Sequence, residues 1–366
     1  MFRKPLSLNG VAVFVLTLGL FMSLCALNVS AQDTGGDNFV YVMTNKNPAN
    51  SVLQFRRAAD GSLSFVREAV TGGSGTGANG ADPLGSQDSL VLSGDGQILL
   101  AANASSNEVT VFSARNGQLT WLSKSSSGGT FPNSVALSGD LVYVLNAQGT
   151  SNITGFRLDT HGTLHWIATV PLPAGTLSPN DVRFTPGGSH ILLTASGSNQ
   201  ILVFDVGDDG VAQAPSVQAS AGGAPFGIRF GHDGVAIVSE AAGSASSYRL
   251  DDDTLDVISG AVSDTQKASC WISVDRAART AYLSNTASGT ISSFQVSGQG
   301  VLALLDAIAA NPGGAPIDSA LSRDSRFLYV VESAQGKTLI FRSSDGGLVS
   351  LGSVSVPLGS QGITAQ

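Results

Sequence analysis

The sequence predicts an all-β fold, a seven-bladed β-propeller with four antiparallel strands per blade and a ring closed by the C-terminal strand. An apolar strand ending in a polar residue occurs seven times, first as YVMTN (41–45) and last as LYVVE (328–332). A second strand follows each one and ends in an aromatic residue. These aromatic residues are Phe55, Phe112, Phe156, Phe204, Tyr248, Phe294 and Phe341, at spacings of 57, 44, 48, 44, 46 and 47 residues. A period near 46 residues with four strands per repeat is typical of propeller blades.

Two further strands complete each unit. A turn rich in Asp, Gly and Asn, such as AADGSL or SSDGGL, leads to an outer strand, and a Gly/Pro-rich crossing leads to the inner strand of the next unit. Inner strands are expected at LVLSGDG (90–96), VALSGD (135–140), VRFTPGG (182–188), IRFGHDG (228–234), ISVDRAA (272–278) and SALSRDS (319–325). The seventh is expected at QGITAQ (361–366), beside YVMTN, where it would leave no open sheet edge.

The N-terminus has the pattern of a secretory signal peptide. Arg3 and Lys4 precede an uncharged apolar stretch from Val11 to Leu27, and Val29-Ser30-Ala31 supplies small residues for cleavage. We therefore predict a signal peptide over residues 1–31, one propeller domain over 32–366, and a secreted or periplasmic protein with no membrane contact after cleavage. An uncleaved membrane anchor is the alternative, because seventeen apolar residues are borderline for a span.

Composition excludes several classes of function. Residues 1–31 hold two basic residues and no acidic ones, so 17 basic and 27 acidic residues remain, a net charge of −10. A chain this acidic should repel nucleic acid and anionic lipid. Cys270 is the one cysteine left after cleavage, so no internal disulfide is expected. No cofactor is predicted, and seven self-closing blades favour a monomer.

GTGANG (75–80) spells G-x-G-x-x-G, the dinucleotide-binding fingerprint. That fingerprint requires a helix directly after the glycines, whose N-terminus holds the pyrophosphate. Here Pro83 and Gly85 follow, and then a strand. We interpret residues 72–86 as an oversized, flexible crossing between the first two blades, either a lid or mere slack, and not as a phosphate site.

The strand order sorts the polar residues onto two rims. We number the strands a to d from the axis outward, so the b–c turns and d–a crossings form the first rim and the other turns form the second. The four histidines, His161, His165, His190 and His232, fall away from the first rim. A Ser–His–Asp or Cys–His site there would therefore lack its base, and no residue spacing resembles a zinc site.

The first rim collects the candidate site residues. The b-strand ends give Asn45, Asn103, Asn146, Ala195, Glu240, Asn285 and Glu332, and the a-strand entries give Asp88, Asn133, Asn180, Asp181, Phe226, Cys270, Trp271, Ile317 and Asp318. Asn, Asp and Glu at strand ends commonly bind turn amides, which is the structural alternative for each of them.

Glu240 and Glu332 stand out because they replace the usual Asn with a charge. Glu240 is our candidate general base on water, with Phe226 and Trp271 walling the substrate. Arg183 and Arg229 occupy matching positions in neighbouring a-strands. Each would either neutralise Glu240, which we favour, or stabilise a developing oxyanion. Cys270 is expected to be a buried small hydrophobe. The remaining candidate substrate-binding residues are Asp181, Asn146, Asn285 and Glu332.

The repeat unit resembles the propeller-type lactonase family, which includes 6-phosphogluconolactonase and the carboxymuconate-cyclising enzymes. The closest stretches are APFGIRFGHDGVAIVSEAAGSASSYRL (224–250) and ASCWISVDRAARTAYLSNTASGTISSF (268–294). The resemblance implies a seven-bladed propeller and a secreted branch carrying P-F-G, S-E-A and A-C-W. Enzymes of the family show P-R-H before the fifth a-strand and N-E after its b-strand. Here Glu240 keeps the acid, whereas Phe226-Gly227 replaces Arg-His, and Ala195–Asn199 replaces an acidic D-L-G-x-D.

Three functions are compatible with these residues. The first is an exported hydrolase that opens a lactone or similar cyclic ester with Glu240 as base. The second is a non-catalytic propeller that binds a small ligand or an envelope partner through the same rim. The third is a hard-cation site at the channel built from Glu240, Glu332 and Asp oxygens, although no metal is part of our main prediction.

Overall fold

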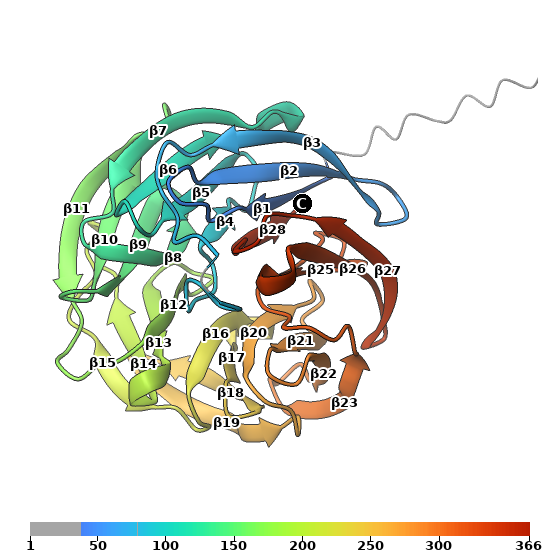
Figure 1. The fold of residues 1–366 in the computed structure, drawn as a ribbon. Coiled ribbons are helices and arrows are strands. Elements are labelled where there is room, and N and C mark those ends of the chain that lie inside the picture. Colours follow the sequence, from blue (N-terminus) through green and yellow to red (C-terminus); the bar gives the residue numbers. More distant parts are fainter. Residues whose placement is uncertain (1–37, 79) are drawn as a thin grey trace, which may run out of the picture. The chain divides into compact units, whose positions relative to one another are not determined.

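The computed structural model describes residues 38–78 and 80–366, which belong to one compact unit. Seven four-stranded antiparallel sheets stand around a common axis, as the repeat predicts (Figure 1). The predicted signal peptide, residues 1–31, lies outside the described residues. Within residues 38–78 and 80–366, no helix has the length and apolar character needed to cross a membrane.

Each blade is listed from its inner to its outer strand. Blade 1 contains β28 (Ile363–Ala365), β1 (Phe39–Met43), β2 (Ser51–Arg57) and β3 (Leu63–Val70). Blade 2 contains β4 (Leu90–Leu92), β5 (Ile98–Asn103), β6 (Glu108–Ser113) and β7 (Thr120–Ser126). Blade 3 contains β8 (Thr130–Ser138), β9 (Leu141–Gln148), β10 (Asn152–Leu158) and β11 (Leu164–Pro171). Blade 4 contains β12 (Pro179–Phe184), β13 (His190–Ala195), β14 (Gln200–Asp205) and β15 (Ser216–Ala219).

The remaining blades follow the same order. Blade 5 contains β16 (Pro225–Phe230), β17 (Ala236–Glu240), β18 (Ser244–Asp251) and β19 (Thr254–Ser263). Blade 6 contains β20 (Ser269–Val274), β21 (Thr280–Asn285), β22 (Thr290–Val296) and β23 (Leu302–Ala310). Blade 7 contains β24 (Ser319–Leu321), β25 (Phe327–Glu332), β26 (Lys337–Ser344) and β27 (Gly347–Ser355). The described helical turns are η1 (Arg115–Gly117), η2 (Ser196–Ser198), η3 (His232–Gly234) and η4 (Ser333–Gln335).

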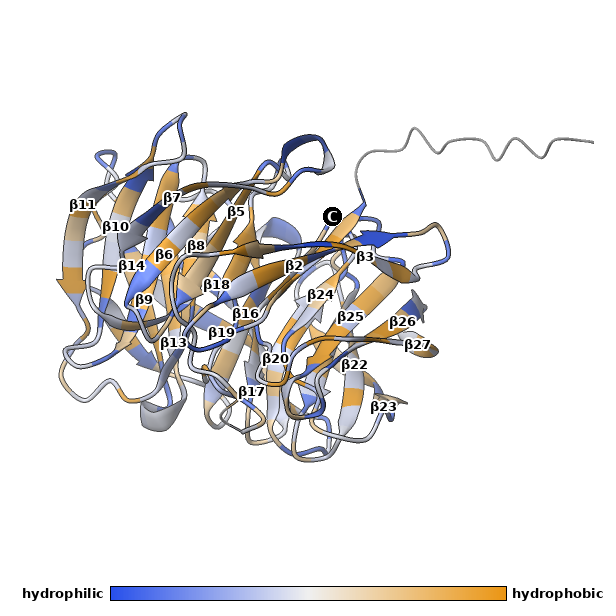
Figure 2. Cartoon of the chain, turned by 45° about the horizontal axis from the view of Figure 1, so that its top comes forward, coloured by the Kyte–Doolittle hydropathy of each residue, from blue (hydrophilic) through white to orange (hydrophobic). Residues whose placement is uncertain are grey.

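The core lies between neighbouring blades. The β-branched run of β6 packs against that of β9, with Val109 and Val111 facing the layer of Val142 and Val144. Both faces of the inner and middle strands are buried in this way, so these strands are continuous apolar runs rather than alternating ones (Figure 2). The outer strands alternate in burial because they have solvent on one side.

The C-terminal strand closes the ring as predicted. β28 pairs antiparallel with β1, matching Val40 to Ala365 and Val42 to Ile363. Both ends of the described chain thus share blade 1, and no inner edge is left open.

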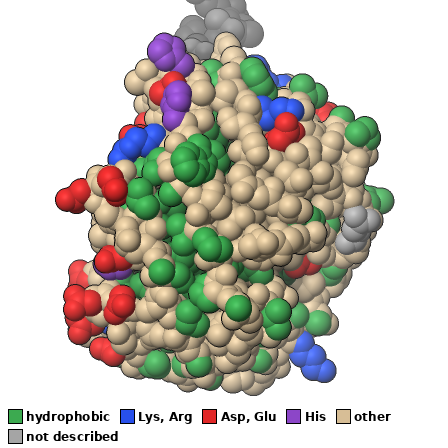
Figure 3. All heavy atoms as spheres, turned by 90° about the vertical axis from the view of Figure 1, so that its left-hand side faces the viewer, with side chains coloured by type: hydrophobic (Ala, Val, Ile, Leu, Met, Phe, Trp, Pro, Cys, Tyr) green, Lys and Arg blue, Asp and Glu red, His purple; other side chains and the backbone are tan. Residues whose placement is uncertain are grey.

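Exposed apolar side chains lie along the outer strands. Phe65, Trp121 and Trp166 are 60%, 49% and 64% exposed on β3, β7 and β11. Figure 3 shows hydrophobic side chains reaching the surface on the side of the ring that carries β11. Each aromatic residue lies opposite the aromatic residue that ends its neighbouring c-strand, for example Trp166 opposite Phe156.

The crossing between blades 1 and 2 does not behave as slack. Its second half, residues 81–88, enters the centre of the ring at the first rim, and we call it the first-rim plug (Figure 1, light blue before β4). The Gln87 side chain donates to the carbonyl of Ile272 at 2.8 Å and accepts from the Ile272 amide at 3.1 Å, so it bonds to blade 6. Trp271 Nε1 donates to the Ser86 carbonyl at 2.9 Å. No helix follows Gly80, in agreement with the interpretation of GTGANG as a loop.

Other blades also bind the plug. Gln361, next to β28, donates to Asp82 Oδ1 at 2.8 Å and accepts from the Leu84 amide at 2.9 Å. Asn180 of blade 4 donates to the Gly85 carbonyl at 2.7 Å. The plug therefore covers the first-rim end of the axial channel and is fixed to strands far apart in the sequence.

Candidate functional site

Glu240 lies at the end of β17, inside the protein rather than at an open mouth. Its side chain is 0% exposed. Oε1 accepts from Ser220 Oγ at 3.2 Å, from the Gly222 amide at 2.9 Å and from Ser246 Oγ, and Oε2 accepts from Ser244 Oγ. A carboxylate with this many donors is well suited to holding the turns of blade 5 together.

Position 222 must be glycine for this contact to form. A Cβ atom there would come within 1.8 Å of Glu240 Oε2. The close approach of backbone to carboxylate explains a glycine at this point of the crossing.

Arg183 and Arg229 do not neutralise Glu240, contrary to the interpretation that we favoured from the sequence. Arg229 binds Asp88 through both nitrogens, Nη1 to Oδ2 at 3.0 Å and Nη2 to Oδ1 at 2.9 Å, and Arg183 Nη1 binds the same carboxylate. No ion pair joins Glu240 to a cationic side chain within residues 38–78 and 80–366. The physical reason is topological: both arginines lie toward the second-rim ends of β12 and β16, whereas Glu240 ends its strand at the first rim.

Three carboxyl groups and two guanidinium groups share the channel axis. We call Asp88, Asp181, Arg183, Arg229 and Asp318 the axial charge cluster. Asp181 Oδ2 lies 3.9 Å from Arg229 Nη1 and accepts from the Ile228 amide at 2.8 Å. Asp318 Oδ1 accepts from the Ser319 amide at 3.0 Å, while the buried Oδ2 has no hydrogen-bond partner among the described residues.

Burial and charge set the protonation of these acids. Burial acts to raise the pKa of Asp88, but the charges of Arg183 and Arg229 outweigh it and hold the pKa below its ordinary value. Burial, together with the charge of Asp88, raises the pKa of Asp181 to about 7. The same two causes raise the pKa of Asp318 well above its ordinary value. Asp88 is therefore the acid of the cluster that stays ionised throughout the neutral range.

A cavity of about 260 Å³ lies against this cluster. We call it the axial cavity. Its lining comes from the inner strands β4, β12, β16, β20, β24 and β28, with Asp88, Arg183 and Arg229 as charged residues and Leu92, Val274, Leu321 and Thr364 among the others. The seventh inner strand, β8, contributes none of the lining residues.

The axial cavity opens toward the second rim. Ser86 and Gln87 of the plug are 0% exposed, whereas residues near the second-rim ends of the inner strands, such as Leu92, Val274 and Leu321, are partly exposed. Exposure thus rises along each of these strands away from the plug. A ligand would enter from the rim opposite the predicted site.

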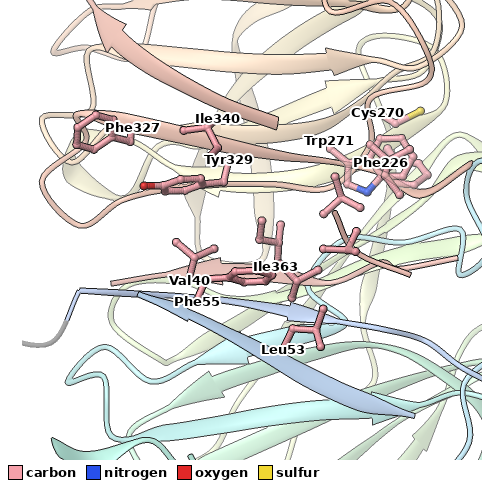
Figure 4. Packing of buried hydrophobic residues seen from close by; sticks show 14 residues of the cluster. Val40, Leu53, Phe55, Phe226, Cys270, Trp271, Phe327, Tyr329, Ile340 and Ile363 are labelled. Atoms are coloured by element: carbon pink, nitrogen blue, oxygen red, sulfur yellow. The ribbon is translucent and has the colours of Figure 1, made fainter. Parts of the chain in front are cut away.

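The predicted aromatic wall is buried beneath the plug. Phe226 and Trp271 are 5% and 1% exposed, and their ring centroids are 4.8 Å apart. Figure 4 shows them side by side with Cys270 within a hydrophobic cluster. A Cβ on Gly227 would come within 2.0 Å of Gln87 Oε1, so the plug occupies the space beside Phe226-Gly227. Cys270 is a buried thiol as expected, and burial raises its pKa.

The amides and the second glutamate hold turns at the first rim. Asn146 Nδ2 donates to the Ser127 carbonyl at 2.9 Å. Asn285, in the amide orientation that satisfies both of its ends, donates to Asp264 at 3.1 Å. Burial raises the pKa of Glu332, with Lys337 opposing the shift, and its Oε1 has no hydrogen-bond partner among the described residues. The structure does not bring these three residues to the axial cavity.

Sequence reasoning placed Asp88 and Asp318 on the first rim without giving them a role. The signal that could have identified Asp88 is the pair of arginines at matching positions in β12 and β16, because two adjacent inward cations require an anion between them. Across the described ranges, 38–78 and 80–366, no group of three His, Cys, Asp or Glu side chains is arranged to hold a metal ion.

Comparisons with known proteins agree with this fold. Residues 86–177 match the family described as "Lactonase, 7-bladed beta-propeller". No curated protein matches the sequence. A periplasmic gluconolactonase from Pseudomonas aeruginosa superposes with a TM-score of 0.72 at 17% identity, covering 90% of this chain and 99% of that one.

Two further solved structures are similar in fold. A protein from Lactobacillus plantarum has a TM-score of 0.73 at 19% identity, over 90% of this chain and 99% of the other. A candidate 6-phosphogluconolactonase from Bacteroides fragilis has a TM-score of 0.71 at 19% identity, over 91% and 99%. On the family's sequence pattern over residues 86–177 and on its fold, the chain is a seven-bladed propeller of the lactonase family.

Proposed function

We propose that the protein is an exported hydrolase that opens a lactone or other small cyclic ester in the axial cavity. The observation that carries this proposal is the meeting of a guanidinium and an ionised carboxylate in one cavity open to solvent. Arg183 uses a single nitrogen on Asp88, and its side chain is 32% exposed. Its other N–H groups have no acceptor among the described residues and are available to a ligand.

The chemistry requires two groups. Arg183 binds the ester carbonyl oxygen and stabilises the oxyanion that forms when water attacks the carbonyl carbon. Asp88 takes the proton from that water, because its pKa keeps it ionised at neutral pH. The ring C–O bond then breaks, and the proton passes to the leaving alkoxide, which gives a hydroxy acid.

Export and a lactone substrate have support of a different kind. The N-terminal pattern is that of a secretory signal, and a structural neighbour is described as a periplasmic gluconolactonase. We propose the same compartment for this chain, a monomeric state and no nucleic-acid partner. Glu240 is the alternative base, although its four donors and full burial leave it without contact with the cavity.

A non-catalytic binding propeller is the second candidate. It is favoured by the three hydrogen bonds that Asp88 already accepts from Arg183 and Arg229. A carboxylate so engaged is typical of a structural ion cluster. In that case the cavity would hold its ligand without turnover.

Hydrolysis by the mature protein tests these alternatives. A panel of glucono-δ-lactone, its 6-phosphate and aliphatic γ- and δ-lactones would be followed by acid release. We expect turnover by the wild type and a loss of about 100-fold or more in Arg183→Gln, the size found when an oxyanion donor is removed. Asp88→Asn should also lose turnover.

Two further variants make the result specific. Arg157→Gln removes an exposed arginine paired with Asp140 and should be unchanged. Glu240→Gln should keep turnover if Asp88 is the base, whereas loss in Glu240→Gln alone would assign the base to Glu240. No turnover by any folded variant, with binding retained, would favour the second candidate.

A further inference from the structure

We infer that the axial cavity is a carboxylate-binding site that holds the anion of a small hydroxy acid more tightly than any neutral molecule of the same shape. The inference deepens the proposed function, because a hydroxy acid is what opening of a lactone produces. It does not require turnover, since it concerns the ligand that the cavity binds best.

The donors are arranged for an anion. Arg183 is the most exposed charged group of the axial charge cluster, and one of its nitrogens is fixed by Asp88. This contact holds the planar guanidinium in place and leaves the remaining N–H groups for a second acceptor. Guanidinium groups bind carboxylates through parallel hydrogen bonds, which a neutral hydroxyl or ester oxygen cannot match.

The charge balance of the cluster favours a negative ligand. Arg183 and Arg229 bring two positive charges, and Asp88 supplies one negative charge at neutral pH. The pKa of Asp318 is raised well above its ordinary value and that of Asp181 to about 7, so these acids do not complete the neutralisation below pH 7. A bound carboxylate would restore the balance in a site largely screened from water.

A second observation, independent of charge, points to a missing partner. Asp318 Oδ2 is buried and has no hydrogen-bond partner among the described residues, although Asp318 is only 2% exposed and its charge interacts with Asp88 and Arg229. Buried polar atoms in native proteins are almost always paired with protein, water or ligand. As a neutral carboxyl group, Asp318 would donate a hydrogen bond to such a partner instead of repelling an anion.

The cavity limits the size of the ligand. Its volume of about 260 Å³ lies below the range of roughly 300–1,000 Å³ for sites of drug-sized ligands. The walls beyond the charged floor are apolar, from residues such as Leu92, Val274 and Leu321. A short carbon chain that ends in a carboxylate matches both features.

Calorimetry with two matched pairs of probes tests the inference. The first pair is gluconate and glucitol, and the second is 6-hydroxyhexanoate and 1,6-hexanediol. In each pair only the first member carries a carboxylate. We expect at least one acid to bind the wild type at least tenfold more tightly than its neutral partner.

Three variants identify the group responsible. Arg183→Gln should weaken acid binding at least tenfold, Arg183→Lys should retain part of the affinity through its charge, and the exposed Arg157→Gln should match the wild type. Binding should be tighter at pH 6 than at pH 8, because Asp181 takes up a proton in that interval while Asp88, Arg183 and Arg229 keep their charges and Asp318 stays neutral.

The outcomes separate this inference from the proposed function. Acid binding that depends on Arg183, without lactone turnover, would uphold the inference and overturn the hydrolase. Lactone turnover with equal affinity for acids and neutral partners would uphold the hydrolase and overturn the inference. Equal binding by wild type and Arg183→Gln, with both folded by circular dichroism, would also overturn it.

Discussion

Asp181 shows how a single buried acid links charge to folding stability. It is 0% exposed, and burial with the charge of Asp88 raises its pKa to about 7. The folded protein therefore binds a proton at Asp181 more tightly than the unfolded chain does. Its effect on the free energy of unfolding is most favourable at low pH and is lost progressively as the pH rises from about 4 to about 7.

Asp181→Asn should reduce this pH dependence. The amide keeps an acceptor for the Ile228 amide and can donate to Ser134, and it cannot ionise. We expect the urea midpoint of the wild type to fall between pH 5 and pH 8 and that of the variant to fall less. The exposed Asp140→Asn is the matched control. Equal slopes for all three proteins would show that Asp181 has an ordinary pKa.

Glu240 makes a contrasting prediction at the same scale. Glu240→Ala removes the acceptor of one backbone amide and three hydroxyls, and each buried donor left unpaired costs about 1–3 kcal/mol of unfolding free energy. Glu240→Gln keeps one oxygen for the Gly222 amide and should cost less. Denaturant titration measures both, with Glu108→Gln, a partly exposed ion-pair partner of Lys124, as control. A fully stable Glu240→Ala would contradict the structural role.

At the scale of elements, the plug decides which rim of the channel is open. Gln87→Ala leaves the amide and carbonyl of Ile272 without their side-chain partner. We expect a loss of about 1–3 kcal/mol in unfolding free energy and faster hydrogen exchange of the Ile272 amide. The exposed Gln213→Ala should change neither quantity. Unchanged exchange at Ile272 would mean that the plug does not protect the first rim.

The strands and the plug differ in how well the sequence predicted them. Strands such as β13 and β21 follow from local apolar runs between turns, and the closing pair of β28 and β1 follows from counting inner strands. The plug was interpreted as flexible because Gly and Pro dominate residues 72–86. Its order comes from Gln87, Asn180 and Gln361, whose partners lie 93 or more residues away and leave no local pattern.

The candidate site was only partly accessible to the same reasoning. The inward position of Arg183 and Arg229 followed from the repeat, whereas their partner did not. Asp88 lies 95 residues from Arg183 and 141 from Arg229, and strand-end acids at the first rim look alike in sequence. The direction in which the channel opens depends on the plug and was therefore also beyond the sequence.

At the scale of the whole molecule, stability depends on ring closure. Deleting residues 363–366 removes β28, exposes the edge of β1 and breaks the packing of Ile363 against the layer between blades 7 and 1. We expect the melting temperature to fall by more than about 10 °C, or folding to lose cooperativity. Ile363→Val, which keeps the strand, should cost only about 0.5–1.5 kcal/mol. A truncated chain as stable as the wild type would show that β28 does not close the ring.

The central claim is that ligands enter the axial cavity from the second rim. The most direct test is calorimetric titration of gluconate or 6-hydroxyhexanoate, whichever binds the wild type, into Thr364→Phe and Thr150→Phe. Thr364 lines the cavity, and Thr150 is an exposed residue of a first-rim turn. The account predicts loss of binding in Thr364→Phe and wild-type affinity in Thr150→Phe. Wild-type affinity in a folded Thr364→Phe, with loss in Thr150→Phe, would place the site on the first rim and contradict the account.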